Sequence, residues 1–274
     1  NYHPVKFGIG LARSNDGGTA WQKKGEILTT YVEPPKEPCN FDCWGVANPT
    51  LYYSPDKKYI YMMYWEVFWG DEWTRPDGLY LARSPVESDG EPGSWEKYKN
   101  GNFSEPGFGG LGSLVLIPPD GTAYGFPYNF IAQPSVSFNT YLNLYVMVCQ
   151  SKIGLHVATS EDGIEWSDLQ MAWEVPALGN TDNDPSVAYF CLISPEQPSQ
   201  MTTSQTGYLY FARMYPNWDP PTTMSRRSFE IKPKSSSTPL TKRDAARSFH
   251  LRNYPNPFNG KTTFGFHMPC SGEV

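Results

Sequence analysis

The sequence has no apolar run that approaches the ~18–20 residues of a membrane-spanning helix. The longest candidate, Tyr59–Phe68, has the length of a β-strand and contains a carboxylate. Positive charge is also scarce, because 22 Lys and Arg against 28 Asp and Glu give a formal net charge of −6. No basic stripe is present to displace counterions from phosphates. The sequence therefore predicts no membrane span and no nucleic-acid partner.

Cysteine is rare as well, with five residues at irregular spacing. Cys39 and Cys43 have no second pair and no nearby histidine, which argues against a zinc site and leaves a local disulfide open. Cys149 and Cys191 lie in apolar segments and are expected to pack as small hydrophobic residues. His156 has no metal-ligand partner in the sequence and is expected on a strand face. We therefore predict no metal and no cofactor.

Proline and glycine, in contrast, are abundant, with 26 and 24 residues. Pro removes a backbone donor and Gly costs helix entropy, so long helices are not expected. The 18 Tyr, 15 Phe and 9 Trp favour pleated, half-buried surfaces. A chain of 274 residues is long enough for one large all-β domain or two ordinary ones.

Three segments share one pattern: a glycine, an alternating apolar strand, Ala-Arg-Ser or Ala-Thr-Ser, an acidic glycine turn and a tryptophan. Asp suits the turn because its side chain closes a local hydrogen bond, and Gly accepts a positive φ. Each segment is predicted to be a β-hairpin, and the Asp and Trp residues are expected to be structural. The segments are Phe7–Trp21, Asp77–Trp95 and Ile153–Trp166.

A second repeated phrase precedes two of these hairpins. Asn48–Glu66 and Gln133–Gln150 both read as a polar residue, Pro, Ser or Thr, an apolar strand, a turn and an aromatic strand. Asp184 opens a third copy. Joined in order, each unit is a four-stranded antiparallel meander, and such units repeated radially are typical of β-propeller blades. A β-sandwich with coincidental turns is the alternative.

The number of repeats predicts an incomplete propeller. Residues 7–30 supply the last two strands of a first blade, and residues 48–98, 130–170 and 184–232 supply three more. About three and a half blades are too few to close a five-bladed ring. We therefore expect an all-β propeller over residues 1–233 that is incomplete at its N-terminus.

The composition changes after the predicted propeller. Residues 234–248 are polar, Ser/Pro-rich and basic, as in a linker. Residues 249–274 contain the phrase "LRNYPNPFN" followed by the alternating "TTFGFHMP". This phrase resembles the start of the C-terminal sorting domain of the type IX (Por) secretion system, a small β-sandwich. The resemblance implies a truncated sorting domain, the secretion machinery as a partner, and a secreted or cell-surface bacterial protein.

The blade pattern over residues 7–232 resembles the five-bladed β-propeller glycosidases of the arabinanase, β-xylosidase and levanase types and the mannoside phosphorylases. In those families, carboxylates near the starts of innermost strands act as acid and base. The aligned positions here are Asn48, Gln133 and Asp184, so the resemblance implies a base or acid-orienting role for Asp184. Glu66 closes an apolar strand, where burial would raise its pKa and suit a general acid. The usual base would lie upstream of the sequence.

Loops and strand ends on the same predicted rim are rich in the groups that recognise sugars. Aromatic faces stack on sugar C–H groups, and carboxylates, amides and Arg bind hydroxyls. The predicted substrate-binding residues are Trp65, Trp69, Asp71, Glu72, Trp73, Gln133, Gln150, Arg213 and Trp218. The sequence thus predicts a secreted glycoside hydrolase that acts on an oligosaccharide or polysaccharide. The alternative is a non-catalytic propeller that binds carbohydrate or another surface ligand.

Overall fold

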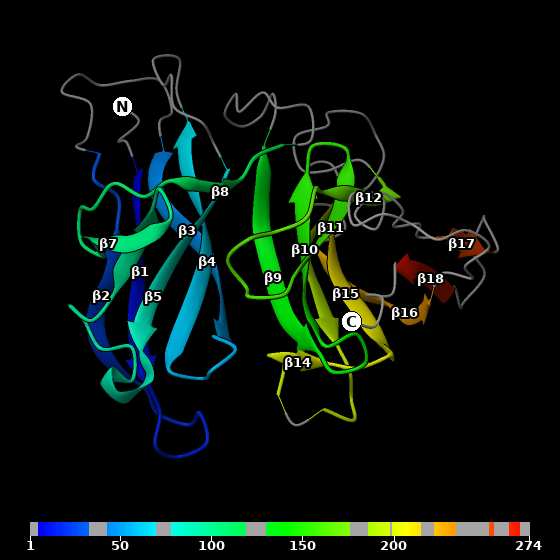
Figure 1. The fold of residues 1–274 in the computed structure, drawn as a ribbon, viewed down its shortest axis with the longest axis horizontal. Helices are drawn as coiled ribbons and strands as arrows, with labels where there is room; N and C mark the ends of the chain where they lie inside the picture. The colour runs from blue at the N-terminus through cyan, green and yellow to red at the C-terminus, as the bar shows by residue number, and fades with distance from the viewer. Residues whose placement is uncertain are drawn as a thin grey trace. The chain divides into compact units, whose positions relative to one another are not determined.

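The computed structural model describes residues 5–32, 43–69, 78–118, 130–175, 186–197, 199–214, 222–233, 252–254 and 263–268. Apart from one short 3-10 helix, η1 (Val86–Ser88), the regular structure of these residues is β-sheet (Figure 1). No helix in this part of the chain is long and apolar enough to cross a membrane. The chain divides into two compact units, Asn1–Pro134 and Ser135–Val274.

Unit 1 contains one large sheet. Its strand order is β2-β1-β3-β4-β5-β6-β7, with β8 paired to β5. The hairpin of β1 and β2 joins β3 through a short parallel pairing, and β3 to β6 form the predicted antiparallel meander. The strands are β1 (Val5–Arg13), β2 (Gln22–Thr29), β3 (Cys43–Tyr53), β4 (Tyr59–Trp69), β5 (Gly78–Pro85), β6 (Glu96–Lys99), β7 (Asn102–Pro106) and β8 (Leu114–Leu116).

Unit 2 contains two five-stranded sheets, with strand orders β12-β11-β10-β9-β14 and β13-β15-β16-β18-β17. The boundary between the units falls inside β9. The first sheet comprises β9 (Ile131–Asn139), β10 (Leu144–Ser151), β11 (Gly154–Ser160), β12 (Gln170–Glu174) and β14 (Thr202–Thr203). The second sheet comprises β13 (Ser186–Ile193), β15 (Thr206–Met214), β16 (Thr223–Pro233), β17 (Arg252–Tyr254) and β18 (Thr263–Met268).

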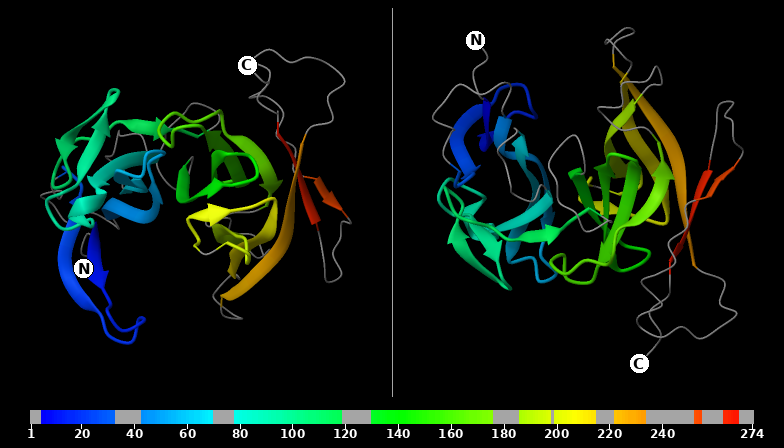
Figure 2. Two further views of the ribbon diagram at one scale, coloured as in Figure 1. Left: turned by 60° about the horizontal axis from the view of Figure 1, so that its bottom comes forward. Right: turned by 90° about the horizontal axis from the view of Figure 1, so that it is seen from above.

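These sheets confirm the predicted fold class, an all-β chain of propeller-type four-stranded meanders. The last sheet differs from the other two at its fourth position. There β18 pairs in parallel with β16, whereas an antiparallel strand follows the third strand in the other sheets. In both views of Figure 2 the red β18 lies alongside the orange β16. The number of blades and the domain boundaries at residues 233 and 248 stay predictions.

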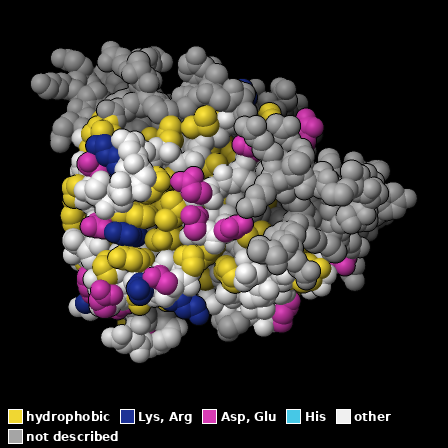
Figure 3. Space-filling model, in the orientation of Figure 1, with side chains coloured by type: hydrophobic (Ala, Val, Ile, Leu, Met, Phe, Trp, Pro, Cys, Tyr) yellow, Lys and Arg dark blue, Asp and Glu magenta, His cyan; other side chains and the backbone are white. Residues whose placement is uncertain are grey.

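Each unit has its own core, which follows from the alternation of side chains along the strands. In unit 1, Ile27 and Leu28 of the first hairpin pack with Met62 and Tyr64 of β4. In unit 2, alternate apolar residues of the two sheets meet, including Val148 from β10 and Phe211 from β15. The face drawn in Figure 3 mixes acidic, basic and apolar side chains.

The acidic glycine turns are built as the sequence predicts. In the third hairpin, Asp162 Oδ1 accepts hydrogen bonds from Ser160 Oγ at 3.0 Å and from the N–H groups of Ile164 and Glu165 at 2.8 and 2.9 Å. In the first hairpin, Asp16 accepts equivalent bonds. Because backbone donors at a tight turn need acceptors, these carboxylates stabilise the turns.

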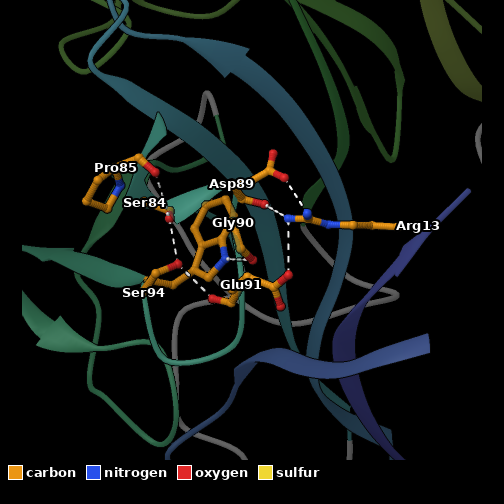
Figure 4. Close-up of polar contacts among 8 residues, drawn as sticks. Arg13, Ser84, Pro85, Asp89, Gly90, Glu91 and Ser94 are labelled. Carbon is orange, nitrogen blue, oxygen red and sulfur yellow. Dashed lines mark hydrogen bonds and ion pairs between the residues drawn. The ribbon is translucent and has the colours of Figure 1, made fainter. Parts of the chain in front are cut away.

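The second hairpin turn is also tied to the first hairpin (Figure 4). Arg13 at the end of β1 forms ion pairs with Asp89 and Glu91. Its Nη2 also donates to the carbonyl of Asp89 at 2.5 Å. Beside it, the indole of Trp95, only 4% exposed, donates to the carbonyl of Gly90 at 2.9 Å. The structural role expected for the tryptophan that follows each turn is thus confirmed at Trp95.

His156 lies on a strand face, as expected, and is buried. It is 2% exposed, pairs across the sheet with Cys149, and its Nε2 lies 2.8 Å from Ser151 Oγ. Its Nδ1 has no hydrogen-bond partner. Burial lowers the pKa of His156 to about 4, because a charged imidazolium would lose its hydration.

This burial predicts a loss of stability in mild acid. As the pH falls from about 6.5 to about 4, the unfolded chain binds a proton on His156 before the folded chain does. The free energy of unfolding should therefore fall by up to about 3 kcal/mol from this residue. Urea unfolding at a series of pH values should show that the free energy of unfolding falls more steeply in acid for the wild type than for His156→Gln. Equal slopes would contradict the prediction.

Candidate functional site

The first strand of each meander carries an unusual backbone feature within the strand. Asn48 in β3, Gln133 in β9 and Tyr189 in β13 have positive φ angles of 50°, 54° and 58°, which are rare for residues other than glycine. A β-bulge accompanies this conformation in β3, after Ala47, and in β13, after Ala188. Such bulges redirect side chains and are frequent beside functional sites.

The third copy differs here from the expectation. Sequence alignment places Asp184 opposite Asn48 and Gln133, but the bulged residue in β13 is Tyr189. Asp184 itself lies outside the described residues. The residues between Pro185 and Tyr189 have no counterpart in the other two copies. Asn48 therefore matches Asp184 when the sequence repeats are aligned and Tyr189 when the bulges are aligned.

The bulges define equivalent positions on the neighbouring strands. In unit 1, Val46 stands two residues before the bulged Asn48 and pairs with Glu66 of β4. In unit 2, Val187 stands two residues before the bulged Tyr189 and pairs with Arg213 of β15. Two residues predicted for the site, one acidic and one basic, thus occupy the same place in two different sheets.

Glu66 is buried at this position. It is 1% exposed, and it is in phase with Met62 and Tyr64, which belong to the core of unit 1. Thr30 hydrogen bonds to its carboxylate, while Oε1 has no partner. Burial raises the pKa of Glu66, and the charge of Lys97 and the bond from Thr30 oppose this rise. This is the direction that the apolar strand around Glu66 predicts.

Lys97 of β6 supplies the compensating charge. Its side chain is fully buried, and Nζ donates to the carbonyls of Thr29 at 2.6 Å and Gly110 at 2.8 Å. Burial lowers the pKa of Lys97, whereas the carboxylates of Glu66 and Glu105 raise it. The ammonium therefore links the end of the first hairpin to the meander and offsets the buried carboxylate.

In unit 2, Gln150 is the buried polar residue. It is 1% exposed, and neither its Oε1 nor its Nε2 has a hydrogen-bond partner. It pairs across the sheet with Leu155, which in turn pairs with Trp173. All three residues therefore lie in one row on one face of the first sheet of unit 2.

Two arginines of the second sheet belong to the same layer. The guanidinium of Arg227 lies 3.9 Å from the ring centroid of Trp173 and 5.6 Å from that of Phe211. Burial and then the like charge of Arg213 lower the pKa of Arg227 to about 10. Arg213 is exposed at the end of β15. Arg227 therefore lies against aromatic rings in this layer, and Arg213 is near enough for its charge to act on Arg227.

The other predicted site residues fall into two groups. Trp65 is half-buried, with its ring centroid 6.4 Å from that of Phe130, and Gln133 is half-buried at its bulge. Asp71, Glu72, Trp73, Asp184, Trp218 and the side chain of Trp69 lie outside the described residues. The catalytic and substrate-binding roles of all these residues stay predictions. Among the described residues, no group of three or more His, Cys, Asp or Glu side chains could hold a metal ion.

Lys97 and Arg227 are absent from the predicted site. The alternation of side chains along the strands could have identified both residues. Lys97 is in phase with the buried Trp95, and Arg227 is in phase with the buried Phe229. In-phase residues of a strand share a face, so both side chains could have been placed on the buried face.

No protein-family profile matches the chain, and no curated protein matches it. Twelve chains of solved structures are similar to it. One is a candidate glycosidase from Bacteroides thetaiotaomicron, at 16% identity and a TM-score of 0.47, with 81% of this chain and 60% of that protein covered. Another is a glycosyl hydrolase from Bacteroides ovatus, at 18% identity and a TM-score of 0.42, with 76% and 51% covered.

A third similar structure comes from the GH130 family of mannoside phosphorylases, which contains glycoside hydrolases that target β-1,2 mannosidic linkages in Candida mannan. It is 15% identical with a TM-score of 0.43, and 81% of this chain and 56% of that protein are covered. The chain thus spans about 60% or less of the length of these structures. At these identities and TM-scores, the comparison assigns neither an activity nor a substrate to this chain.

Replacing Lys97 should destabilise the protein strongly. In Lys97→Met, Glu66 would stay buried without its compensating charge and two carbonyls would lose their donor. We expect the free energy of unfolding to fall by about 3 kcal/mol in urea denaturation. Adding Glu66→Gln should recover part of this loss, because the uncompensated charge is then gone.

The matched control is Lys99→Met, which removes a lysine of the same strand. Lys99 pairs with Glu105 at 2.8 Å, and both side chains are partly exposed. This change should cost less than about 1 kcal/mol. Equal losses for the two lysines would contradict the structural role of Lys97.

Proposed function

We propose that the protein is a glycoside hydrolase that acts on an oligosaccharide or polysaccharide. The observation that carries this proposal is Glu66, a buried carboxyl group with a raised pKa at the end of the second strand of a propeller-type sheet. A carboxyl group with a raised pKa keeps its proton to a higher pH than a free glutamate does, and it can donate that proton to a glycosidic oxygen. Glu66 is thus the proposed general acid.

The reaction needs a second carboxylate to activate water or to attack the anomeric carbon. Asp184 is the proposed second group, on the strength of its Asp-Pro-Ser sequence before β13. Trp65, Gln133, Gln150 and Arg213 would hold the sugar, together with the predicted residues that lie outside the described ranges. Aromatic rings would stack on the sugar, while amides and the guanidinium would bind its hydroxyls.

A non-catalytic carbohydrate-binding protein is the second candidate. The specific observation in its favour is the environment of Glu66, which is 1% exposed and electrostatically coupled to Lys97. A carboxylate held in this way has a sufficient structural role. In that case, the sheets would present aromatic and polar groups to a glycan without cleaving it.

Turnover separates the two candidates. The intact protein should release reducing sugar from a panel of plant and microbial polysaccharides. Glu66→Gln and Asp184→Asn should each lower the rate by about 10²–10⁴-fold, the usual contribution of a positioned acid or base. Glu96→Gln, which removes an exposed carboxylate that pairs with Arg83, is the matched control and should keep its rate. Unchanged turnover in both site variants would refute the assignment.

We also propose that the protein is secreted or held at the cell surface through its C-terminal segment. The support is the sequence phrase at residues 251–259. In a bacterium with type IX secretion, the intact protein should appear in the medium or on the surface. A variant that lacks the chain from residue 249 onward should stay inside the cells. Export of both forms would contradict this role, as would retention of both.

A further inference from the structure

The packed layer between the two sheets of unit 2 changes from apolar to polar at one end. Val146 and Val148 lie in its core, and Gln150 follows in phase on the same face. From the other sheet, Leu209 and Phe211 lie in the core, and Arg213 follows in phase. Alternation along both strands thus turns two polar side chains toward the same layer.

Trp173 connects the two sides. It stands in the row of Gln150 and Leu155 in the first sheet. Its ring contacts Phe211 of the second sheet, at 5.2 Å between centroids, and carries the guanidinium of Arg227 at 3.9 Å. Gln150, Trp173, Arg213 and Arg227 therefore all face this layer, with Arg227 opposite Leu209 and Arg213 four residues further along β15. These four residues are called the arginine cluster below.

The charges of this cluster suit an anion. Arg213 and Arg227 lie close enough for the charge of one to act on the other, within a protein whose formal net charge is −6. The contact with the ring of Trp173 holds the guanidinium of Arg227 in this layer. Arg213 is exposed, and a guanidinium matches a carboxylate, which accepts two parallel hydrogen bonds from the arginine fork.

Gln150 adds an independent sign of a ligand. Its amide is buried, and neither the donor nor the acceptor atom is satisfied. A buried amide without partners costs free energy, and native proteins rarely leave one unexplained. A bound molecule with hydroxyl groups would satisfy both atoms, since a hydroxyl can donate to Oε1 and accept from Nε2.

We propose that the arginine cluster binds a sugar that carries a carboxylate group, which makes the substrate or ligand an acidic glycan. This inference rests on the proposed carbohydrate function and names the class of sugar. The carboxylate binds the guanidinium of Arg213 at the exposed end of the layer, assisted by Arg227. A hydroxyl of the same sugar binds the amide of Gln150.

The test measures binding of matched acidic and neutral sugars to the intact protein by calorimetry. The probes are trimers of galacturonate, glucuronate and mannuronate, each compared with its methyl ester, which keeps the ring and removes the charge. At least one acid should bind tenfold or more tightly than its ester, and salt should weaken that binding. If no acid binds better than its ester, the inference is overturned.

Single substitutions test whether the sugar binds at the arginine cluster. Arg213→Gln, at an exposed position, should lower the affinity for the preferred acid about tenfold or more and leave the affinity for its ester unchanged. Gln150→Leu should weaken the binding of the acid and of the ester alike, because it removes hydrogen bonds to a hydroxyl group of the sugar. Arg226→Gln is the matched control, since Arg226 follows the opposite phase of β16 and stacks on Tyr208. Equal losses in Arg213→Gln and Arg226→Gln would overturn the site.

The outcomes also separate this inference from the proposed hydrolysis. If an acidic sugar binds in a manner that depends on Arg213 but no sugar is released, the proposed binding site at the arginine cluster is supported and the proposed hydrolase activity is refuted. Hydrolysis of neutral glycans with no preference for acids would keep the hydrolase and refute the cluster. Thermal unfolding of each variant checks that it is folded, and Arg213→Lys should retain part of the acid preference through its charge.

Discussion

The structure depends on one packing constraint, the face-to-face burial of alternate strand residues between β-strand layers. Removing apolar side chains from water is the main favourable term in such a fold, and it requires every second residue of a strand to face the same layer. A polar residue that continues this phase at a strand end must enter the layer as well. Glu66 and Gln150 are buried for this reason, and Arg213 continues the same phase at the exposed end of β15.

Equivalent strand positions carry an acidic side chain, Glu66, in unit 1 and a basic side chain, Arg213, in unit 2. Glu66 is buried. Its burial is tolerated because the charge of Lys97, whose ammonium bonds to the carbonyl of Thr29, offsets that of the carboxylate, and because Thr30 donates a hydrogen bond to it. Arg213 is exposed, and its charge acts on a second arginine, Arg227. The repeated scaffold thus places a buried carboxyl group in one sheet and an exposed guanidinium at the equivalent position in another.

Local patterns predicted the meanders and the acidic turns, because alternation and Asp-Gly turn chemistry act within a few residues. They did not predict that Lys97 would face Glu66, since a partner in another strand depends on which face is covered. The bulge at Tyr189 was also missed, because one extra residue in a strand changes the phase without a sequence signature. The parallel pairing of β18 with β16 involves residues far apart in the chain, and alternation alone cannot specify it.

The most direct test of this account is the titration of the Glu66 carboxyl group by carbon-13 NMR in the intact protein. The account predicts a pKa above that of a free glutamate, and a still higher value in any folded variant in which Lys97 has lost its charge. If Glu66 titrates like a free glutamate, its carboxyl group is hydrated. The buried proton donor on which the proposed chemistry rests would then not exist.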